Sequence, residues 1–439
     1  MIQNCEPAMT LKAVDEPRRW PWDTYTSRDR RRFLLILFLV GTSNYVDKNI
    51  IGVILEQIKV EFHTSDTKLG LLSGIAFALF YATLGIPVAR WADRGDRKLI
   101  MTLSLAVWSV MTGLCGFAAT FWQLMAARFG VGAGEAGAIP SAQSLLAEYY
   151  SPTERARAIG IFMMSATAGY TVALLLGGWV AQNYGWRAAF AVAAMLGLAL
   201  VPLTHWTLKE PRRMPEFAIQ TKTHESALVS IYLLLGKPAY RNILAAIIAY
   251  FLMAYGGMVF IVSLMIRSHG LNVSQAGAFF GTISAVGSMV GTFSGGALAD
   301  RLAKQDIIWL PRLAGWGMIA AMPLYELALY TPTIWVMTPL LLLATVFMWG
   351  VSPPMWAALH AVCGSKRRAM AVAVAFFFAN LIGLGLGPVI AGSLSDTFAV
   401  AHGSANGLRY AMMVVMLVFV PGGLFLFRAA RYIEADSEK

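Results

Sequence analysis

The chain alternates between long apolar runs and short polar segments. A helix that crosses a bilayer needs roughly 20 mainly apolar residues, and windows of that length predict twelve spans in the 439 residues. The first six are predicted at 33–58, 69–90, 99–119, 122–147, 155–180 and 187–208. The last six are predicted at 241–266, 275–299, 310–330, 333–358, 369–394 and 409–428. The pattern therefore predicts an all-α, polytopic membrane protein with twelve transmembrane helices.

The longest polar stretch inside the chain, at about 209–239, divides the spans into two sets of six. Residues 225–235 within it are predicted to form a short amphipathic helix on the membrane surface. The predicted organisation is an N-terminal tail (1–32), a six-helix bundle (33–208), a linker (209–239), a second six-helix bundle (240–428) and a C-terminal tail (429–439).

Charge supports a membrane location and predicts the orientation. Only 13% of the residues are charged, against roughly 25% in soluble domains. Of the 35 Lys and Arg residues, 28 lie in the two tails, the even-numbered loops and the linker. This positive-inside pattern predicts that both termini are cytoplasmic, with Arg28 and Arg30–Arg32 as a basic anchor beside anionic lipid. The net charge of +11 is therefore not read as a nucleic-acid surface. The short loops are typical of a bacterial inner membrane protein.

Other classes of protein find little support. The three cysteines, Cys5, Cys115 and Cys363, have neither metal-ligand nor paired spacing, so no metal, cofactor or disulfide is predicted. The first 32 residues are polar, and no cleavable signal peptide is predicted. The sequence has no His-Glu-x-x-His pair, no Gly-x-Ser-x-Gly elbow and no phosphate-binding loop. We therefore expect neither an enzyme nor an ATP-driven pump.

The two halves share a polar loop. The loop after span two reads Asp93-Arg94-Gly95-Asp96-Arg97-Lys98, and Asp300-Arg301 follows span eight, 207 residues further along. Duplicated halves are how many secondary transporters alternate access, and a channel or receptor would not explain the repeat. We predict that these loops form a conformational latch made by Asp93, Arg94, Arg97, Lys98, Asp300 and Arg301. Simple topology charge would explain the cations but not Asp93.

The loop and the six-plus-six layout resemble the major facilitator superfamily over nearly the whole chain. Three segments within that pattern are similar to its Spinster branch, which is associated with lysophospholipid and sphingoid-phosphate transport: Asn44–Lys48, Arg128–Ala136 and Gly383–Pro388. Related bacterial carriers of organic acids share parts of these segments. The resemblance implies the major facilitator fold, in which spans one and four line the central cavity.

One residue departs from the resembled pattern. The branch usually has Arg after the Asp of span one, and this chain has Lys48. Arg presents a bidentate fork to phosphate or carboxylate, whereas the Lys ammonium is a point charge. Phosphate binding at this position is therefore not carried over from the family.

Four charged residues are predicted at bilayer depth, where charge is costly and marks functional sites. They are Asp47 and Lys48 in span one, and Arg128 and Glu135 in span four. Asp47 and Glu135 fall near the middle of their spans. Lys48 projects roughly 100° around the helix from Asp47, so the two side chains point in different directions.

These four residues are predicted to couple transport to protons. Burial favours a neutral carboxyl and a nearby cation favours the carboxylate, so a cation that moves between two carboxylates makes a proton switch. The resemblance implies the same role, with Asp47 and Glu135 as proton carriers. The alternative is a static clasp between spans one and four. Glu326, near the outer end of span nine, is expected to reach the interface instead.

The second half has aromatic residues at the corresponding depth and no charge. Aromatic stripes in membrane helices usually serve packing, but a cavity that is charged on one side and apolar on the other suits an amphiphile. The predicted substrate-binding residues are Asn44, Lys48, Arg128, Tyr170, Tyr255, Trp349 and Phe377. Ser352-Pro353-Pro354 is a candidate hinge in span ten, because Pro removes a helical hydrogen bond.

Together these features predict a proton-coupled secondary transporter of a lipid-like amphiphile, such as a lysophospholipid or a sphingoid phosphate. A monomer in the bilayer is expected. The alternative is a proton symporter that imports an aromatic or other organic acid, in which Lys48 or Arg128 pairs with the substrate carboxylate.

Overall fold

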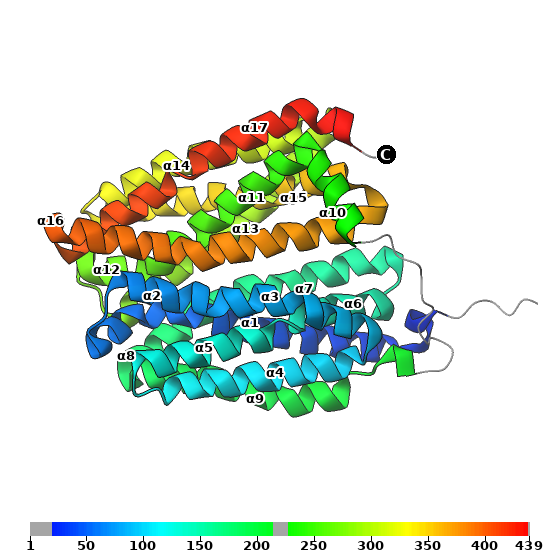
Figure 1. Ribbon diagram of the computed structural model, residues 1–439, viewed down its shortest axis with the longest axis horizontal. Helices are drawn as coiled ribbons and strands as arrows, with labels where there is room; N and C mark the ends of the chain where they lie inside the picture. The colour runs from blue at the N-terminus through cyan, green and yellow to red at the C-terminus, as the bar shows by residue number, and fades with distance from the viewer. Residues whose placement is uncertain (1–19, 214–226, 438–439) are drawn as a thin grey trace, which may run out of the picture.

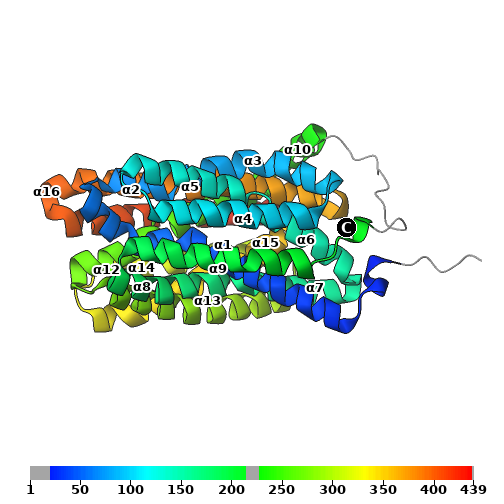
Figure 2. The same ribbon diagram turned by 90° about the horizontal axis from the view of Figure 1, so that it is seen from below.

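A computed structural model describes residues 20–213 and 227–437, and every regular element within these ranges is helical. The helices run along the long axis in two bundles that lie side by side (Figure 1). Figure 2 shows the same arrangement from below. The described N-terminal residues and the end of α17 lie at one end of the molecule, which we call the terminal end. The opposite end, which carries α12 and the tip of α16, is the far end.

The first bundle contains six spans built from helical segments with several interruptions. They are α1 (Ser27–Phe62), α2 with α3 (Asp66–Ser73, Ile75–Arg94), α4 (Arg97–Gly116), α5 with α6 (Phe121–Glu135, Ala138–Tyr149), α7 with the π-helical η2 and α8 (Pro152–Val172, Ala173–Gly177, Gly178–Tyr184), and α9 (Trp186–Thr207). Short 3₁₀ turns flank them at Pro21–Thr24 and Pro211–Arg213.

The second bundle begins after the short helix α10 (Ala227–Gly236). Its elements are α11, η5 and α12 (Pro238–Gly256, Met258–Phe260, Ile261–His269), α13 (Val273–Ala303), α14 (Trp309–Tyr330), α15 (Ile334–Phe378), the π-helical η6 (Ala379–Leu386), α16 (Gly387–Met416) and α17 (Phe419–Asp436). Non-helical dihedral angles at Gly364 and Gly403 separate the last three spans, which gives six in this half.

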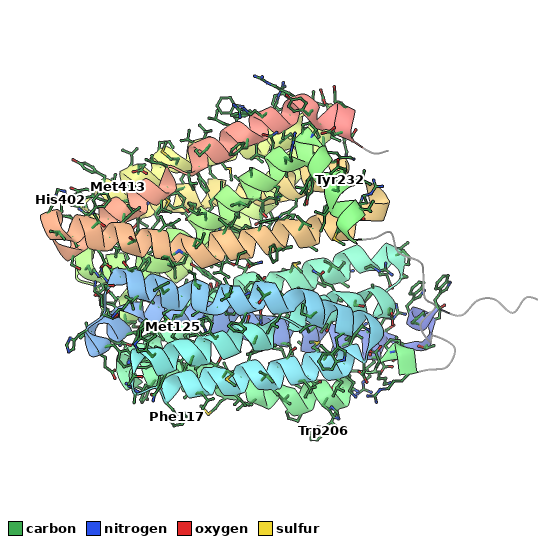
Figure 3. All side chains as sticks on the ribbon, in the orientation of Figure 1. Phe117, Met125, Trp206, Tyr232, His402 and Met413 are labelled. Atoms are coloured by element: carbon green, nitrogen blue, oxygen red, sulfur yellow. The ribbon has the colours of Figure 1, made fainter. Side chains whose placement is uncertain are left out.

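These segments confirm the predicted all-α fold with twelve spans. In the described residues, nine segments are long and apolar enough to cross a membrane, and one of them, Met370–Asp436, contains two spans. The break between α5 and α6 and the less apolar α14 account for the other two. Large apolar side chains cover the outer surface, and Phe117, Trp206 and Tyr232 are at least 79% exposed (Figure 3). Such a surface requires lipid as its solvent.

Helix ends follow local sequence signals. Thr26 and Asp29 form a reciprocal capping box at the start of α1, and Asn272 with Gln275 does the same for α13. Pro152 occupies the first turn of α7, where its missing N–H is not needed. These caps place the polar loops at the ends of the spans.

The candidate hinge at Ser352-Pro353-Pro354 is not a break in this structure, because α15 stays helical through both prolines and departs from helical geometry at Gly364. The segment before the prolines is closely packed. Gly291 and Gly295 of α13 lie against the α15 backbone near Gly350, and a Cβ on either glycine would meet backbone atoms of α15. This contact supports the segment before the two prolines.

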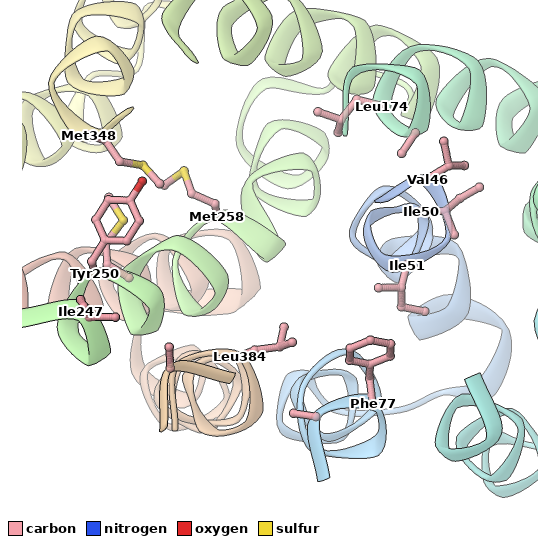
Figure 4. Close-up of a cluster of buried hydrophobic side chains, with 14 of the residues drawn as sticks. Val46, Ile50, Ile51, Phe77, Leu174, Ile247, Tyr250, Met258, Met348 and Leu384 are labelled. Atoms are coloured by element: carbon pink, nitrogen blue, oxygen red, sulfur yellow. The ribbon is translucent and has the colours of Figure 1, made fainter. Parts of the chain in front are cut away.

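The halves meet closely at the far end. A Cβ at Gly392 of α16 would overlap the carbonyl of Asp66, and one at Gly70 would overlap the carbonyl of Pro388. Gly277 of α13 similarly lies against the Leu174 carbonyl of the π-helical segment. Nearer the centre, Phe77 of α3 faces Leu384 of η6 (Figure 4). Glycine therefore allows backbone-to-backbone contact between the two halves.

Candidate functional site

The four charged residues predicted at bilayer depth meet inside the first bundle. Asp47 and Lys48 are neighbours on α1, and their side chains leave the helix in different directions. Lys48 Nζ lies 3.7 Å from Glu135 Oε2, and Arg128 Nη1 lies 3.6 Å from Asp47 Oδ1. The cluster therefore consists of two ion pairs, each between α1 and α5. Glu135 is the last residue of α5, where span four is interrupted.

All four side chains are removed from solvent. Their exposed fractions are 6% for Lys48, 0% for Glu135, 1% for Arg128 and 2% for Asp47. Thr112 of α4 donates a hydrogen bond to Asp47 Oδ2, and Arg128 Nη1 also donates to the Asp47 carbonyl at 3.4 Å. Asp47 is thus the better held of the two carboxylates.

Glu135 is held loosely. No hydrogen bond within 3.5 Å reaches either of its carboxylate oxygens from the described residues. Asn44, one helical turn before Lys48, is buried beside Glu135. Asn44 also borders a cavity of about 20 Å³ together with Ser165, which exceeds the space that one water molecule needs. A buried carboxyl with few donors around it is suited to exist as a neutral acid.

Aromatic rings surround the cation of this pair. The ammonium of Lys48 lies 4.6 Å from the ring centre of Tyr81, 5.0 Å from Phe77 and 5.5 Å from Tyr45. Tyr255 of the second half also lies near Lys48. The cluster therefore faces the second bundle through tyrosine side chains.

The other residues predicted to bind substrate are more scattered. Tyr170 of α7 lies near Ser284 and Tyr255 of the second half. Trp349 packs over Gly291 of α13, and Phe377 forms an edge-to-face ring contact with Phe378 at 5.3 Å. The structure brings Asn44, Lys48, Arg128 and Tyr255 to one region. Trp349 and Phe377 contact their own bundle.

The residues predicted to form a latch divide into two groups. The Arg97 side chain is fully buried and binds Glu148 at 2.6 Å and also Glu210 of the linker. Glu210 accepts backbone hydrogen bonds from Arg97 and Lys98 as well. Arg97 therefore fastens the linker to spans three and four within one half.

Asp300 and Arg301 are exposed at the end of α13. The side chains of Asp93 and Arg94 lie outside the described residues. Glu326 is half-buried on α14, one turn from the end of span nine.

A polar cluster at the far end joins the two halves. Arg267 of α12 donates to both oxygens of Asp66 at 2.7 and 2.8 Å and to Glu56 at 2.9 Å. Asp396 of α16 accepts the backbone N–H groups of Asp66 and Thr67 at 2.9 and 2.8 Å. We call Glu56, Lys59, Asp66, Thr67, Arg267, Ser395 and Asp396 the far-end cluster.

The far-end cluster was not predicted from the sequence. The available signal was the position of Glu56, Lys59, Asp66, Arg267 and Asp396 at ends of spans on the same predicted side of the membrane. Their pairing depends on how the bundles dock, which a single sequence does not show.

Comparison with known proteins gives a consistent result. The family profile described as Major Facilitator Superfamily matches residues 37–388. The chain is 31% identical over 401 residues to an MFS-type efflux pump of Mycolicibacterium smegmatis, covering 90% of this chain and 92% of that protein. It is 27% identical to protein spinster homolog 1 of Xenopus tropicalis, over 92% of this chain and 81% of that protein.

A solved structure is similar over nearly the whole chain. It is the crystal structure of a bacterial homolog of the human lysosomal transporter Spinster, in an inward-facing and unoccupied conformation. The TM-score is 0.85 at 30% identity, and the match covers 94% of this chain and 100% of that one.

Proposed function

Since this chain belongs to the major facilitator superfamily, we propose that it is a proton-coupled secondary transporter of an amphiphilic, lipid-like substrate. The observation that carries the proposal is the buried pair of Lys48 and Glu135, which lies at the centre of one half and faces a second half without charge at that depth. Residues 242–266, 275–299, 333–358 and 369–394 contain no Asp, Glu, Lys or Arg.

The geometry of Glu135 supports proton coupling. A carboxylate buried in a membrane protein is costly, and the cation paired with Glu135 is Lys48, at 3.7 Å. Protonation removes that cost and frees Lys48. Asp47 keeps Arg128 and the Thr112 hydroxyl, so we propose that Glu135 takes up the proton and that Asp47 holds Arg128 in place.

The contacts between the halves support alternating access. The far-end cluster and the glycine contacts join the bundles at the far end, while Arg97 and Glu210 at the terminal end bind within the first half. We propose that the terminal end is cytoplasmic, as the positive-inside pattern indicates, and that the structure is inward-facing. On this proposal, transport requires the far-end contacts to break.

Charge on one wall and aromatic rings on the other support an amphiphile as substrate. Among similar proteins, the sphingosine-1-phosphate transporter SPNS2 of Danio rerio is 23% identical over 92% of this chain and 84% of that protein. A single-chain lipid with a charged head would place its head near Lys48 and Arg128 and its chain against the second half.

A second candidate is a proton symporter of an organic acid. The two buried cations favour it, because either can pair with a carboxylate. The hexuronate transporter of Bacillus subtilis is 23% identical over 90% of this chain and 95% of that protein.

Reconstitution in proteoliposomes tests both candidates. Uptake of lysolipids and of aromatic acids is measured with and without a pH gradient, followed by Glu135→Gln and Asp47→Asn. We expect gradient-driven uptake of a lysolipid, and Glu135→Gln should abolish it while preserving substrate exchange, which needs no net protonation cycle. Glu154→Gln is the control, since Glu154 forms an exposed ion pair with Arg30. Uptake of acids alone supports the second candidate, and gradient-driven uptake unchanged by both variants excludes proton coupling through these residues.

A further inference from the structure

The Lys48 ammonium needs a partner in the state in which Glu135 is neutral. When Glu135 becomes neutral, the Lys48 ammonium loses the carboxylate at 3.7 Å. Lys48 is then a buried cation, and its neighbour Asp47 is already paired with Arg128. An uncompensated buried charge is strongly destabilising. Something else must hold the ammonium in this state.

Three aromatic rings are in position to do so. Tyr45, Phe77 and Tyr81 all have their ring centres within 5.5 Å of Lys48 Nζ, inside the range of about 6 Å over which a ring face attracts a cation. Tyr45 is on the same helix as Lys48, three residues before it. Phe77 and Tyr81 are four residues apart on α3, so they project from one face of that helix.

Packing fixes the rings independently of the ion pair. Phe77 is 1% exposed and stacks on Tyr81 at 5.3 Å between ring centres. Gly132 of α5 supports this arrangement, because a Cβ there would overlap the Phe77 carbonyl. Phe77 also lies 5.5 Å from the guanidinium carbon of Arg128, so one ring contacts both cations of the cluster.

We propose that Tyr45, Phe77 and Tyr81 form an aromatic cage that holds the Lys48 ammonium when Glu135 is neutral. The rings carry no proton that exchanges in this step, so their attraction persists when Glu135 is neutral, and the ammonium then depends on it more because the carboxylate no longer offsets its charge. The cage keeps Lys48 charged and in place, ready to pair with Glu135 again after the proton leaves. Tyr81 is the positioning residue most open to test, because it is half-buried at the edge of the cage.

The identity of the cation fits this role. A Lys ammonium is compact and makes no bidentate contact with a carboxylate, so its partners are chosen mainly by distance. At this position three ring faces approach it from α1 and α3, and Tyr255 lies near it from the second half. Tyr255 therefore borders the side of the cage that faces the other bundle.

A thermal-melting cycle in detergent tests the cage without relying on transport. Tyr81→Leu removes the ring face, and the matched control Tyr81→Phe keeps it while losing the hydroxyl. Each change is made in the wild type, in Glu135→Gln and in Lys48→Met. We expect Tyr81→Leu to lower the melting temperature by about 2–4 °C more in Glu135→Gln than in the wild type. Tyr81→Phe should show no such difference.

The Lys48→Met background identifies the cause. Without the ammonium, the loss caused by Tyr81→Leu should fall below its value in the wild type, and this comparison remains readable if Glu135→Gln does not fold. Equal losses in all backgrounds would show that Tyr81 only fills space, and would overturn the cage.

The proposal rests on Glu135 as the proton acceptor for its role in transport, and a second measurement addresses that role. Tyr81→Leu should shift the pH profile of gradient-driven uptake, and Tyr81→Phe should leave it in place. If uptake is independent of the pH gradient but the melting cycle shows the expected coupling, proton coupling is wrong and the cage stands. If uptake is gradient-driven and the two Tyr81 variants have the same pH profile, the cage has no part in coupling.

Discussion

Arg267 of the second half donates two hydrogen bonds to the carboxylate of Asp66 in the first half, at 2.7 and 2.8 Å. Both side chains are nearly inaccessible, with exposed fractions of 6% and 2%. Lys59 and Ser395 bind the same carboxylate at 2.7 and 2.6 Å. The ion pair is therefore the centre of the contact between the bundles, and it must break if the far end opens.

Removing this cation should favour opening of the far end. Arg267→Met leaves Asp66 and Glu56 without a shared partner. In a cysteine-free background, labelling of Ala391→Cys by a membrane-impermeant maleimide should rise about fivefold or more, as expected for a coupling of at least 1 kcal/mol. Ala391 is 0% exposed on α16 in the closed arrangement. Arg187→Met is the control, since its ion pair with Glu61 stays within the first half. Unchanged labelling would mean that the cluster does not hold the far end closed.

Gly392 should not tolerate a side chain. A Cβ at this position meets the Asp66 carbonyl, a backbone atom that cannot rotate away. Gly392→Ala should therefore prevent closure of the far end and reduce substrate exchange at least about tenfold. The matched control is Gly160→Ala on α7, where nothing lies within 4 Å of the added atom. Normal exchange by Gly392→Ala would contradict the tight contact.

Arg97 and Asp93 should behave differently, although both belong to the predicted latch. Arg97→Gln leaves Glu148 and Glu210 without their shared cation, and the free energy of unfolding should fall by about 3–5 kcal/mol. Asp93→Asn should preserve stability and slow turnover more than it weakens equilibrium substrate binding. Thermal melting together with binding and exchange assays separates the two. Similar melting temperatures for Arg97→Gln and the wild type would rule out the structural role.

Lys48→Arg should preserve gradient-driven uptake. The longer guanidinium remains within reach of Glu135, and the rings around Lys48 also accept it. Because Arg binds phosphate through two parallel hydrogen bonds, the variant should favour substrates that carry a phosphate over those that carry a carboxylate. Competition between a phosphate-bearing and a carboxylate-bearing amphiphile measures this ratio, with Lys48→Met as the comparison. A ratio equal to that of the wild type would show that Lys48 does not contact the head of the substrate.

Two serines at opposite ends test the orientation. Ser437 follows α17 at the terminal end, and Ser404 follows the break at Gly403 at the far end. In intact cells, an impermeant maleimide should label Ser404→Cys, and it should label Ser437→Cys only after permeabilisation. The reverse pattern would place the terminal end outside the cell.

The hydrophobic pattern was sufficient to predict the twelve spans. The cost of charge in lipid was sufficient to single out Asp47, Lys48, Arg128 and Glu135. The four charged residues predicted at bilayer depth meet in the structure, because helical rise along each span places Asp47 and Glu135 near the middle of their spans. Their pairing was not predicted. One cation shared between the two carboxylates was expected, and the structure pairs each carboxylate with its own cation.

Features that depend on docking between helices were not predictable. The rings around Lys48 come from α1 and α3, and the partners of Asp66 come from the other bundle. The π-helical segments at 173–177 and 379–386 were also missed, since their apolar sequences are equally compatible with an ordinary α-helix. Pro353 and Pro354 do not break the helix, since α15 stays helical through both residues.

The confinement of charge at the depth of Asp47 to one half has a consequence for how this protein can change over evolutionary time. Substitutions among the uncharged residues of the second half alter the shape of that wall, and the ion pair between Lys48 and Glu135 stays within the first half. Under the proposed function, substrate preference can thus change through substitutions in one bundle while the other retains the proton site. Chimeras that exchange second halves between relatives would then combine the proton coupling of one parent with the substrate preference of the other.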